Sequence, residues 1–404
     1  MRCALPTQRT RRTQRFSCTG LILCVLGVLC VERGAAAQEP SAPQAVSAAQ
    51  LKAAIDKLGD LDYATRTNAS RTIRRTAAAQ AVPALLQAVA EHRDGYVRYR
   101  ALVLLTGFND PRAKDAMREA LASPNDRLRT VAYSFFEHNP DRAMTATFLA
   151  ALDKEQAEFV RPSLVRALAA LPPQPALVRE VSRGEDFFRS AVIEALGDYK
   201  AAYALDAITA VAKIEGPLQD DAALALGKIS DKRSLETLAA MQRSASRATQ
   251  PSIAAAICLL GVNCEVHENY LIETLKFADK NGGFQELLRG AAAGLGVLAV
   301  AGHDEAVNAL FDIGIPARDD STRAPVALAL ATVSLRNTAL MMPILEKRAD
   351  RDKAMALVAE GFDMLEEDLD KERFFAFARR TYWDSPETSP RRALMQTLIG
   401  KLDF

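Results

Sequence analysis

An apolar residue followed by arginine recurs along the chain and divides it into units of similar length. Four such dipeptides occur at intervals of 31, 32 and 28 residues, and Leu218-Gln219 continues the series after 30 more. The four are Val97-Arg98, Leu128-Arg129, Val160-Arg161 and Phe188-Arg189. Self-similarity at this spacing is typical of repeat proteins, in which each unit is one small group of secondary-structure elements.

Each of the five units carries the apolar pattern of an amphipathic helix. The residues four, seven and eight places after the first residue of each marker are all apolar, and these offsets lie on one face of an α-helix. In the first unit they are Ala101, Leu104 and Leu105. The pattern predicts one helix per unit with a buried apolar side.

The end of this helix and a second helix are also predicted. Gly197 and Gly227 stand nine places after the marker and Gly107 ten places after it, which suits a left-handed residue at a helix C-terminus. A polar turn and a second amphipathic segment follow, as at 112–121 and 234–241. Each unit is therefore predicted to be an antiparallel helix pair.

About ten such units fit between residues 48 and 365, where the register continues more loosely at both ends. A single helix pair cannot cover its own apolar face, so the pairs are expected to stack. The hydrophobic content of 49% with only 6% aromatic residues favours packed helices over β-sheets. The predicted fold is an all-α solenoid, preceded by a disordered lead-in at 38–47.

Residues 366–404 are predicted to form a C-terminal helical cap, because the end of a repeat array needs an atypical closing unit. Aromatic residues concentrate there, and a ligand pocket is the alternative interpretation of them. They are Phe374, Phe375, Phe377, Tyr382 and Trp383.

The segments YVRYRALVLLTGFND, FFRSAVIEALGD and DDAALALGKISDKRSLETL resemble HEAT repeats, in particular the short bilin-lyase-type repeats. The resemblance implies a helical superhelix and says little about function. It also implies that the arginine ladder is structural, each arginine pairing with a turn acid of an adjacent repeat, for which Asp110, Asp141 and Asp198 are available. Anion binding is the alternative role. The ladder consists of Arg98, Arg129, Arg161 and Arg189.

Residues 1–37 have the pattern of a secretory signal peptide. A basic start precedes an apolar run at 21–31, which is shorter than the roughly 20 residues that span a bilayer, and Ala35-Ala36-Ala37 offers a cleavage site. The protein is therefore expected to be exported, to the periplasm or out of the cell. An uncleaved anchor and an organelle transit peptide are the alternatives. No transmembrane segment is expected in the mature chain.

The charge after cleavage disfavours nucleic acid as a partner. The whole chain has 51 basic and 50 acidic residues, of which the signal holds six Arg and one Glu, leaving 45 and 49, a net charge of −4. A nucleic-acid-binding surface needs an excess of basic residues. The expected partner is a protein or peptide.

Only two of the six cysteines, Cys258 and Cys264, lie beyond the signal. Two thiols six residues apart in an oxidising compartment suggest a local disulfide. Two inert thiols, or a redox or metal site, are the alternatives, but the chain has no C-x-x-C motif.

The histidines give no catalytic pattern. HEAT-like di-iron hydroxylases use repeated His-Glu pairs, whereas this chain has one, His267-Glu268, and an incomplete second one at His303-Asp304. Each histidine is therefore expected to be a solvated loop residue. The sequence predicts no enzyme, no metal and no other cofactor. The alternative is a HEAT-like enzyme that binds a metal or, as bilin lyases do, a tetrapyrrole.

Offsets two and six of each repeat lie on the helix face opposite the apolar one, which is expected to line the concave side of the superhelix. This face is chemically mixed, which suits a protein partner better than a polyanion. The protein is predicted to be a monomeric, non-catalytic scaffold, or alternatively a regulatory module of an envelope complex. The candidate partner-binding residues are Tyr99, Ser134, Arg166 and Glu194.

Overall fold

The computed structural model describes residues 45–402, and this part of the chain is helical with no β-strand. The described residues all belong to one compact unit, Ala37–Phe404. The predicted signal at 1–37 and most of the lead-in at 38–47 lie outside the described residues. The prediction of an all-α solenoid is confirmed.

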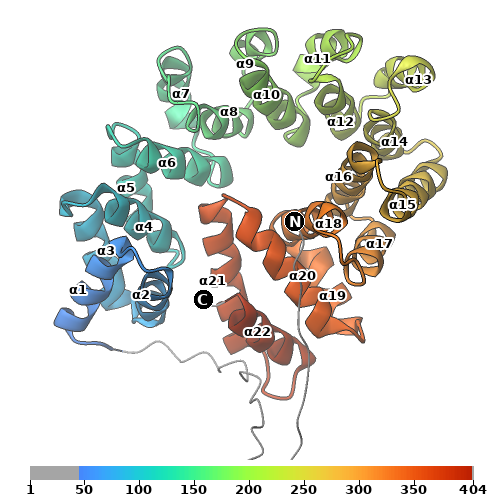
Figure 1. Ribbon diagram of the computed structural model, residues 1–404. Coiled ribbons are helices and arrows are strands. Elements are labelled where there is room, and N and C mark those ends of the chain that lie inside the picture. Colours follow the sequence, from blue (N-terminus) through green and yellow to red (C-terminus); the bar gives the residue numbers. More distant parts are fainter. Residues whose placement is uncertain (1–44, 403–404) are drawn as a thin grey trace, which may run out of the picture. The chain divides into compact units, whose positions relative to one another are not determined.

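The even-numbered helices carry the markers that define the repeats. They form ten consecutive units: α2 Tyr63–Arg75, α4 Gly95–Thr106, α6 Asp126–His138, α8 Arg161–Ala169, α10 Asp186–Asp198, α12 Gln219–Ile229, α14 Gln250–Leu259, α16 Gln285–Ala301, α18 Asp320–Arg336 and α20 Arg351–Met364. Successive members of this series contact one another. Figure 1 shows α8 to α18 of this series on the inner side of the curve.

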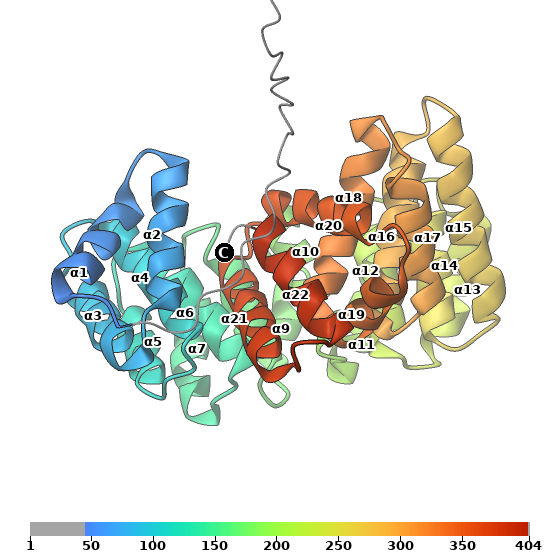
Figure 2. The same cartoon turned by 90° about the horizontal axis from the view of Figure 1, so that it is seen from below.

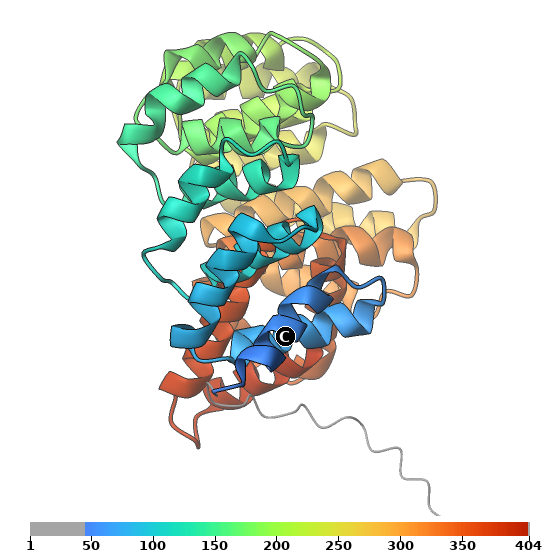
Figure 3. The ribbon, with the colours of Figure 1, turned by 90° about the vertical axis from the view of Figure 1, so that its left-hand side faces the viewer.

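The odd-numbered helices form the outer layer. They are α1 Ala48–Asp56, α3 Ala78–Glu91, α5 Ala113–Ala120, α7 Thr145–Leu152, α9 Pro175–Glu180, α11 Leu205–Ala212, α13 Ser234–Ser244, α15 Cys264–Lys280, α17 Asp304–Gly314 and α19 Thr338–Lys347. Short 3₁₀ turns lie at Lys57–Gly59, Arg142–Met144 and Ala202–Ala204. The side view in Figure 3 shows the pairs stacked in layers.

The predicted apolar face forms the core. Of the twenty residues at offsets zero, four, seven and eight in the five best-defined units, nineteen are buried and Phe135 is half-buried. Burying apolar surface contributes roughly 25 cal/mol per Å², so this face supplies much of the stability of each unit. The inner helices therefore pack through the residues that the periodicity selects.

The predicted role of the repeat glycines is wrong. Gly107, Gly197 and Gly227 are not left-handed; the left-handed residue falls later, twelve places after the marker, at Asn109, Lys200 and Ser230. The glycines instead allow close approach. A Cβ on Gly227 would lie 2.5 Å from the Ala256 Cα of the next inner helix, and one on Gly197 would lie 2.8 Å from the Ala225 Cα.

Two further helices follow the last repeat: α21 Asp368–Asp384 and α22 Pro390–Lys401. Helix α22 packs on α19 and α20, as a terminal cap does, but α21 also contacts α4, α6 and α18. Figures 1 and 2 show α21 and α22 (red) beside both the first and the last repeats. The C-terminal segment thus returns to the start of the array.

Within residues 45–402, no single helix has both the length and the apolar character needed to cross a membrane. Helices α18 and α19 meet that criterion only as a pair, which is bent by 117°.

Candidate functional site

An acidic segment, residues 367–372 with the sequence EDLDKE, binds the inner surface of the first repeats. Glu372 on α21 accepts two hydrogen bonds from Arg74 on α2, with Nη2–Oε2 at 2.6 Å and Nε–Oε2 at 2.9 Å. The two side chains are only 6% and 1% exposed. Gly107 leaves room for this contact, because a Cβ there would lie 2.6 Å from Glu372 Oε1.

The other acids of the segment bind cations from three inner helices. Asp368 accepts a hydrogen bond from the Tyr99 hydroxyl and lies 3.2 Å from Arg100 on α4. Asp370 lies 2.7 Å from His138 Nε2 on α6 and 3.5 Å from Arg336 on α18. Helices distant in the sequence therefore meet at one acidic segment.

The surroundings of Asp370 determine the charge state of its carboxyl group. Burial alone would raise the pKa of its carboxyl, but the hydrogen bond from His138 and the positive charge of Arg336 lower it well below its usual range. Asp370 is therefore held in its charged form. Burial instead raises the pKa of the Asp368 carboxyl, although Arg100 lies beside it.

A row of alternating charges runs along the inner surface near the C-terminal ends of the helices. Arg166 lies between Glu137 and Asp198, at 2.8 Å and 2.9 Å, and Lys228 continues the row at 2.7 Å from Asp198. The Tyr199 hydroxyl donates to Glu137 Oε1 at 2.9 Å. We call Glu137, Arg166, Asp198 and Lys228 the charge row; it joins four successive repeats.

Exposed aromatic side chains occur at or just before the N-terminal ends of α4, α8 and α10. Tyr96, Phe159 and Phe187 each stand one place before the repeat marker and are 36%, 73% and 55% exposed. On a helix, one place before the marker lies on the same face as offsets two and six, so Tyr96 and Phe187 face the inner surface, while Phe159 lies in the turn just before α8. We call the three residues the aromatic row. In the intervening repeat this position is Arg127, whose guanidinium lies 5.6 Å from the Tyr96 ring.

A cavity of about 770 Å³ lies between α21 and the turns that follow α4 and α6. Asn109, Phe135 and Lys114 line it on the repeat side, and Phe374 and Phe377 on the α21 side. Its size falls within the range of ligand pockets. Two of the C-terminal aromatic residues thus line a cavity, whereas Tyr382 is buried and Trp383 is half exposed.

The four predicted partner-binding residues lie in different environments. Tyr99 is buried against α21, and Ser134 Oγ is 3.3 Å from Ser163 Oγ. Arg166 belongs to the charge row. Glu194 is exposed on α10; desolvation by the neighbouring helices, and then the negative charge of Asp221, raise the pKa of its carboxyl group. The structure does not gather the four at one point. The sequence pattern gave no sign that α21 would cover Tyr99.

The arginine ladder makes contacts that hold the repeats together, but not with the predicted acids. Arg129 and Arg161 pair with glutamates of the following repeat, and Arg98 and Arg189 donate to backbone carbonyls at the end of the preceding outer helix. Those partners are Glu155, Glu185, Val89 and Val181. Asp110, Asp141 and Asp198 pair with other cations.

The prediction that every histidine is a solvated loop residue is wrong. His138 ends α6 and its side chain is 15% exposed against Asp370. His92 lies 3.3 Å from Asp56, and burial lowers the pKa of His267. The sequence pattern predicts a loop position for a histidine at a helix end because the pattern does not reveal its acidic partner elsewhere in the chain.

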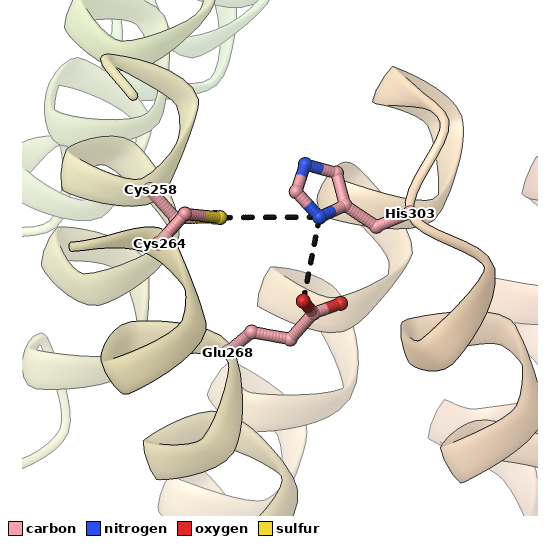
Figure 4. Close-up of a disulfide and its surroundings, with 4 residues drawn as sticks. All are labelled: Cys258, Cys264, Glu268 and His303. Atoms are coloured by element: carbon pink, nitrogen blue, oxygen red, sulfur yellow. Dashed lines mark hydrogen bonds and ion pairs between the residues drawn. A yellow bond between two sulfur atoms is a disulfide. The ribbon is translucent and has the colours of Figure 1, made fainter. Parts of the chain in front are cut away.

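The two cysteines lie together with a histidine and a glutamate. The structure places the Cys258 and Cys264 sulfur atoms at disulfide distance. His303 Nδ1 is 3.9 Å from Cys264 Sγ and 3.4 Å from Glu268 Oε2 (Figure 4). The spacing predicts Cys258 and Cys264 as a pair, but nothing in the sequence pattern connects them with Glu268 and His303.

The family model for HEAT repeats matches residues 51–135, which cover helices α1 to α6 except for the first three residues of α1 and the last three of α6. The part of the chain that the structure describes is an all-α solenoid, and the match identifies the repeats within residues 51–135 as HEAT repeats. No curated protein matches the sequence.

Among solved structures, the chain is similar to importin beta at 14% identity and a TM-score of 0.39, over 87% of this chain and 55% of that one. It is similar to Kap121p at 14% identity and a TM-score of 0.31, over 88% of this chain and 40% of that one. The complex of CpcE and CpcF of phycocyanin lyase from Nostoc sp. PCC7120 aligns at 17% identity and a TM-score of 0.25, over 80% and 97% of the two chains. The chain spans about half the length of the importin beta chain it matches.

Proposed function

We propose that the protein is a non-catalytic scaffold that binds an extended segment of a protein partner along its inner surface. The observation that carries the proposal is the aromatic row, which places large apolar side chains in solvent at equivalent positions of nearby repeats. Aromatic residues are enriched in protein interfaces and supply most of the binding hot spots. In a solenoid, equivalent positions form a continuous binding surface.

The charge row supports a peptide rather than a polyanion as the occupant. Its alternating signs offer both donors and acceptors to a peptide, and its net charge is zero, because Glu137 and Asp198 balance Arg166 and Lys228. A partner lying between the two rows would bury apolar side chains on one side and meet polar groups on the other, which is the usual anatomy of an interface.

The experiment compares capture of a partner by the wild-type protein and a Phe159→Ala/Phe187→Ala variant. A photo-crosslinking residue at position 187 identifies the partner, and the affinity of the purified pair is then measured. Loss of two hot-spot aromatics is expected to weaken binding by at least about tenfold, which corresponds to about 1.4 kcal/mol. Both side chains are exposed, so folding should be unaffected.

Tyr270→Ala is the matched control, because Tyr270 is 39% exposed and lies on the outer helix α15. It should bind the partner as the wild type does. Equal affinity of the wild type and the double variant for the cross-linked partner would remove the proposal.

We propose further that the protein is exported and acts as a monomer in the periplasm or outside the cell, free or attached to an envelope complex. The support is the signal-like pattern of residues 1–37 in the sequence. Mass spectrometry of the mature protein should give Gln38 as the first residue, and light scattering should give one chain per particle. A cytoplasmic protein that retains residues 1–37 would contradict the proposed location.

A further inference from the structure

Four side chains with metal-binding chemistry converge where two adjacent repeats meet. Cys258 lies near the end of α14, Cys264 begins α15, and Glu268 follows one helical turn later on the same face. His303 immediately precedes α17 in the next repeat. The ligand atoms of Cys258, Cys264 and His303 all lie within 4.8 Å of one another. Figure 4 shows Glu268 and His303 pointing toward each other beside the cysteines.

Glu268 is the group that a disulfide alone does not explain. It is 7% exposed, and within residues 45–402 its buried Oε1 atom has no hydrogen-bond partner. Its Oε2 atom lies 3.4 Å from His303 Nδ1. A buried carboxylate with an unsatisfied oxygen is costly unless a cation or donor compensates it. The carboxylate therefore points to a cation at this place.

Two separations in the cluster, both measured to His303 Nδ1, are close to those of atoms that share one ion; Glu268 lies beside the three residues whose ligand atoms are all within 4.8 Å of one another. In a tetrahedral zinc site, a nitrogen and an oxygen ligand lie about 3.3 Å apart, and a sulfur and a nitrogen ligand about 3.6 Å. The corresponding distances here are 3.4 Å for Glu268 Oε2 and 3.9 Å for Cys264 Sγ, both measured to His303 Nδ1. Two thiolates on the same ion lie about 3.8 Å apart, so the sulfur atoms must separate before both can bind.

The turn between the cysteines can accommodate this separation. Gly261 and Asn263 both have positive φ, of 74° and 44°, and a Cβ on Gly261 would meet nothing within 4 Å. Gly261 is thus free of close packing, so the turn can shift there; Cys258 is buried, so a rotation of the half-buried Cys264 side chain is what would open the sulfur pair.

We propose that, when Cys258 and Cys264 are reduced, these two thiolates bind one Zn²⁺ ion together with His303 Nδ1 and the Glu268 carboxylate. Thiolate and imidazole ligands select zinc over harder cations, and four protein ligands make a closed site. The ion would join the α14–α15 turn to the α16–α17 turn of the next repeat. The inference does not rest on the proposed function.

The disulfide and the metal site are alternative states of the same residues. An external dithiol reduces the disulfide by transferring two electrons and two protons, and itself becomes a disulfide. Zinc binding then forms two Zn–S bonds and releases both thiol protons to water. The oxidised pair has no thiolate to offer, so metal binding requires the reduced state.

Cobalt(II) titration of the full-length reduced protein tests the proposal, because tetrahedral Co²⁺–thiolate sites are coloured. A phosphine reductant keeps the cysteines reduced. One Co²⁺ per chain should produce visible bands and a sulfur charge-transfer band, and one equivalent of Zn²⁺ should abolish them. The same protein with its disulfide intact should give no sulfur charge-transfer band.

Three variants separate the ligands from their surroundings. Cys258→Ser/Cys264→Ser should abolish the sulfur band. Glu268→Gln and His303→Gln should each weaken Co²⁺ binding by at least about 10–100-fold, because loss of a direct ligand costs no less than loss of an outer-shell partner. His267→Gln is the matched control, because His267 neighbours Glu268 in sequence but lies outside the cluster; it should bind as the wild type does.

Circular dichroism establishes that each variant is folded, and the His303 side chain is 30% exposed, so its replacement should not disturb packing. The proposal is overturned if the folded, reduced wild-type protein binds no Co²⁺. It is equally overturned if His303→Gln and Glu268→Gln bind as tightly as His267→Gln.

Discussion

Arg74 and Glu372 lie 298 residues apart in the sequence and form a buried ion pair. The repeat pattern does not predict this contact, because neither residue occupies one of the apolar positions that the pattern selects. The same limit applies to His138, whose partner Asp370 belongs to a segment without the repeat. By contrast, Leu104 and Leu196 are correctly predicted to be buried, since periodicity alone determines which face of a helix is covered.

Glu372→Ala should destabilise the protein by about 3–5 kcal/mol, because it leaves the Arg74 guanidinium buried without a counter-charge. Urea unfolding followed by circular dichroism measures the change. Arg74→Met/Glu372→Leu removes both charges and should recover most of the loss. A single variant as stable as the wild type would show that this pair is not buried in solution.

Gly227→Ala should cost about 1–3 kcal/mol, because the added Cβ would lie 2.5 Å from the backbone of Ala256 and the inner helices would have to separate. Gly216→Ala is the control, since a Cβ there meets nothing within 4 Å. Its effect should stay within about 0.5 kcal/mol. Equal thermal stability of the two variants would contradict the close packing of α12 on α14.

At the scale of the helix pair, the sequence predicts the inner helices better than the connections between them. Arg129 pairs with Glu155 rather than with a turn aspartate, because ladder contacts depend on loop geometry that the repeat pattern does not encode. The left-handed residues show the same limit. Asn109 and Ser230 adopt this conformation although glycine was expected to do so two or three residues earlier, because the glycines are needed for close packing.

Asp141 links two successive helix pairs and should make the folding stability of the protein depend on pH. Its hydrogen bonds with Lys114 of α5, the Ala143 amide and Arg118 hold its pKa at about 2, below its usual value of 3.8. A carboxyl whose pKa is lower in the folded state stabilises the protein above the unfolded pKa, and this contribution is lost as the pH falls from about 4 to about 2.

Asp141→Asn tests this dependence because asparagine can still accept the Ala143 hydrogen bond but carries no charge. The variant should be less stable than the wild type at pH 7, and the difference should disappear by about pH 2. Thermal unfolding at a series of pH values measures both. A difference that is the same at pH 7 and pH 2 would exclude the charge as its cause.

At the scale of the whole described unit, the helices that follow the last repeat contact the first repeats as well. Residues 366–404 were predicted to cap the last pair, and α22 does pack there, but α21 continues to α4 and α6. Leu369 of α21 even belongs to the apolar core of the first repeats. Local periodicity cannot reveal such a contact, because it depends on the cumulative curvature of ten pairs.

Deletion of residues 366–404 should open the array. Without α21, the first repeats lose their contact with the end of the chain, so the radius of gyration from small-angle scattering should increase. Amide exchange in α2 and α4 should become faster, while exchange in α12 should change little. An unchanged scattering profile would mean that α21 does not hold the two ends together.

The return of α21 also restricts how the number of repeats can change. Open solenoids tolerate the gain or loss of an internal unit, because each unit touches only its neighbours. Here an added pair would carry Glu372 of α21 past Gly107, and a lost pair would leave it short of Gly107, so Arg74 would lose its counter-charge in either case. Insertion or removal of one internal unit should therefore be far more damaging in this chain than in an open array.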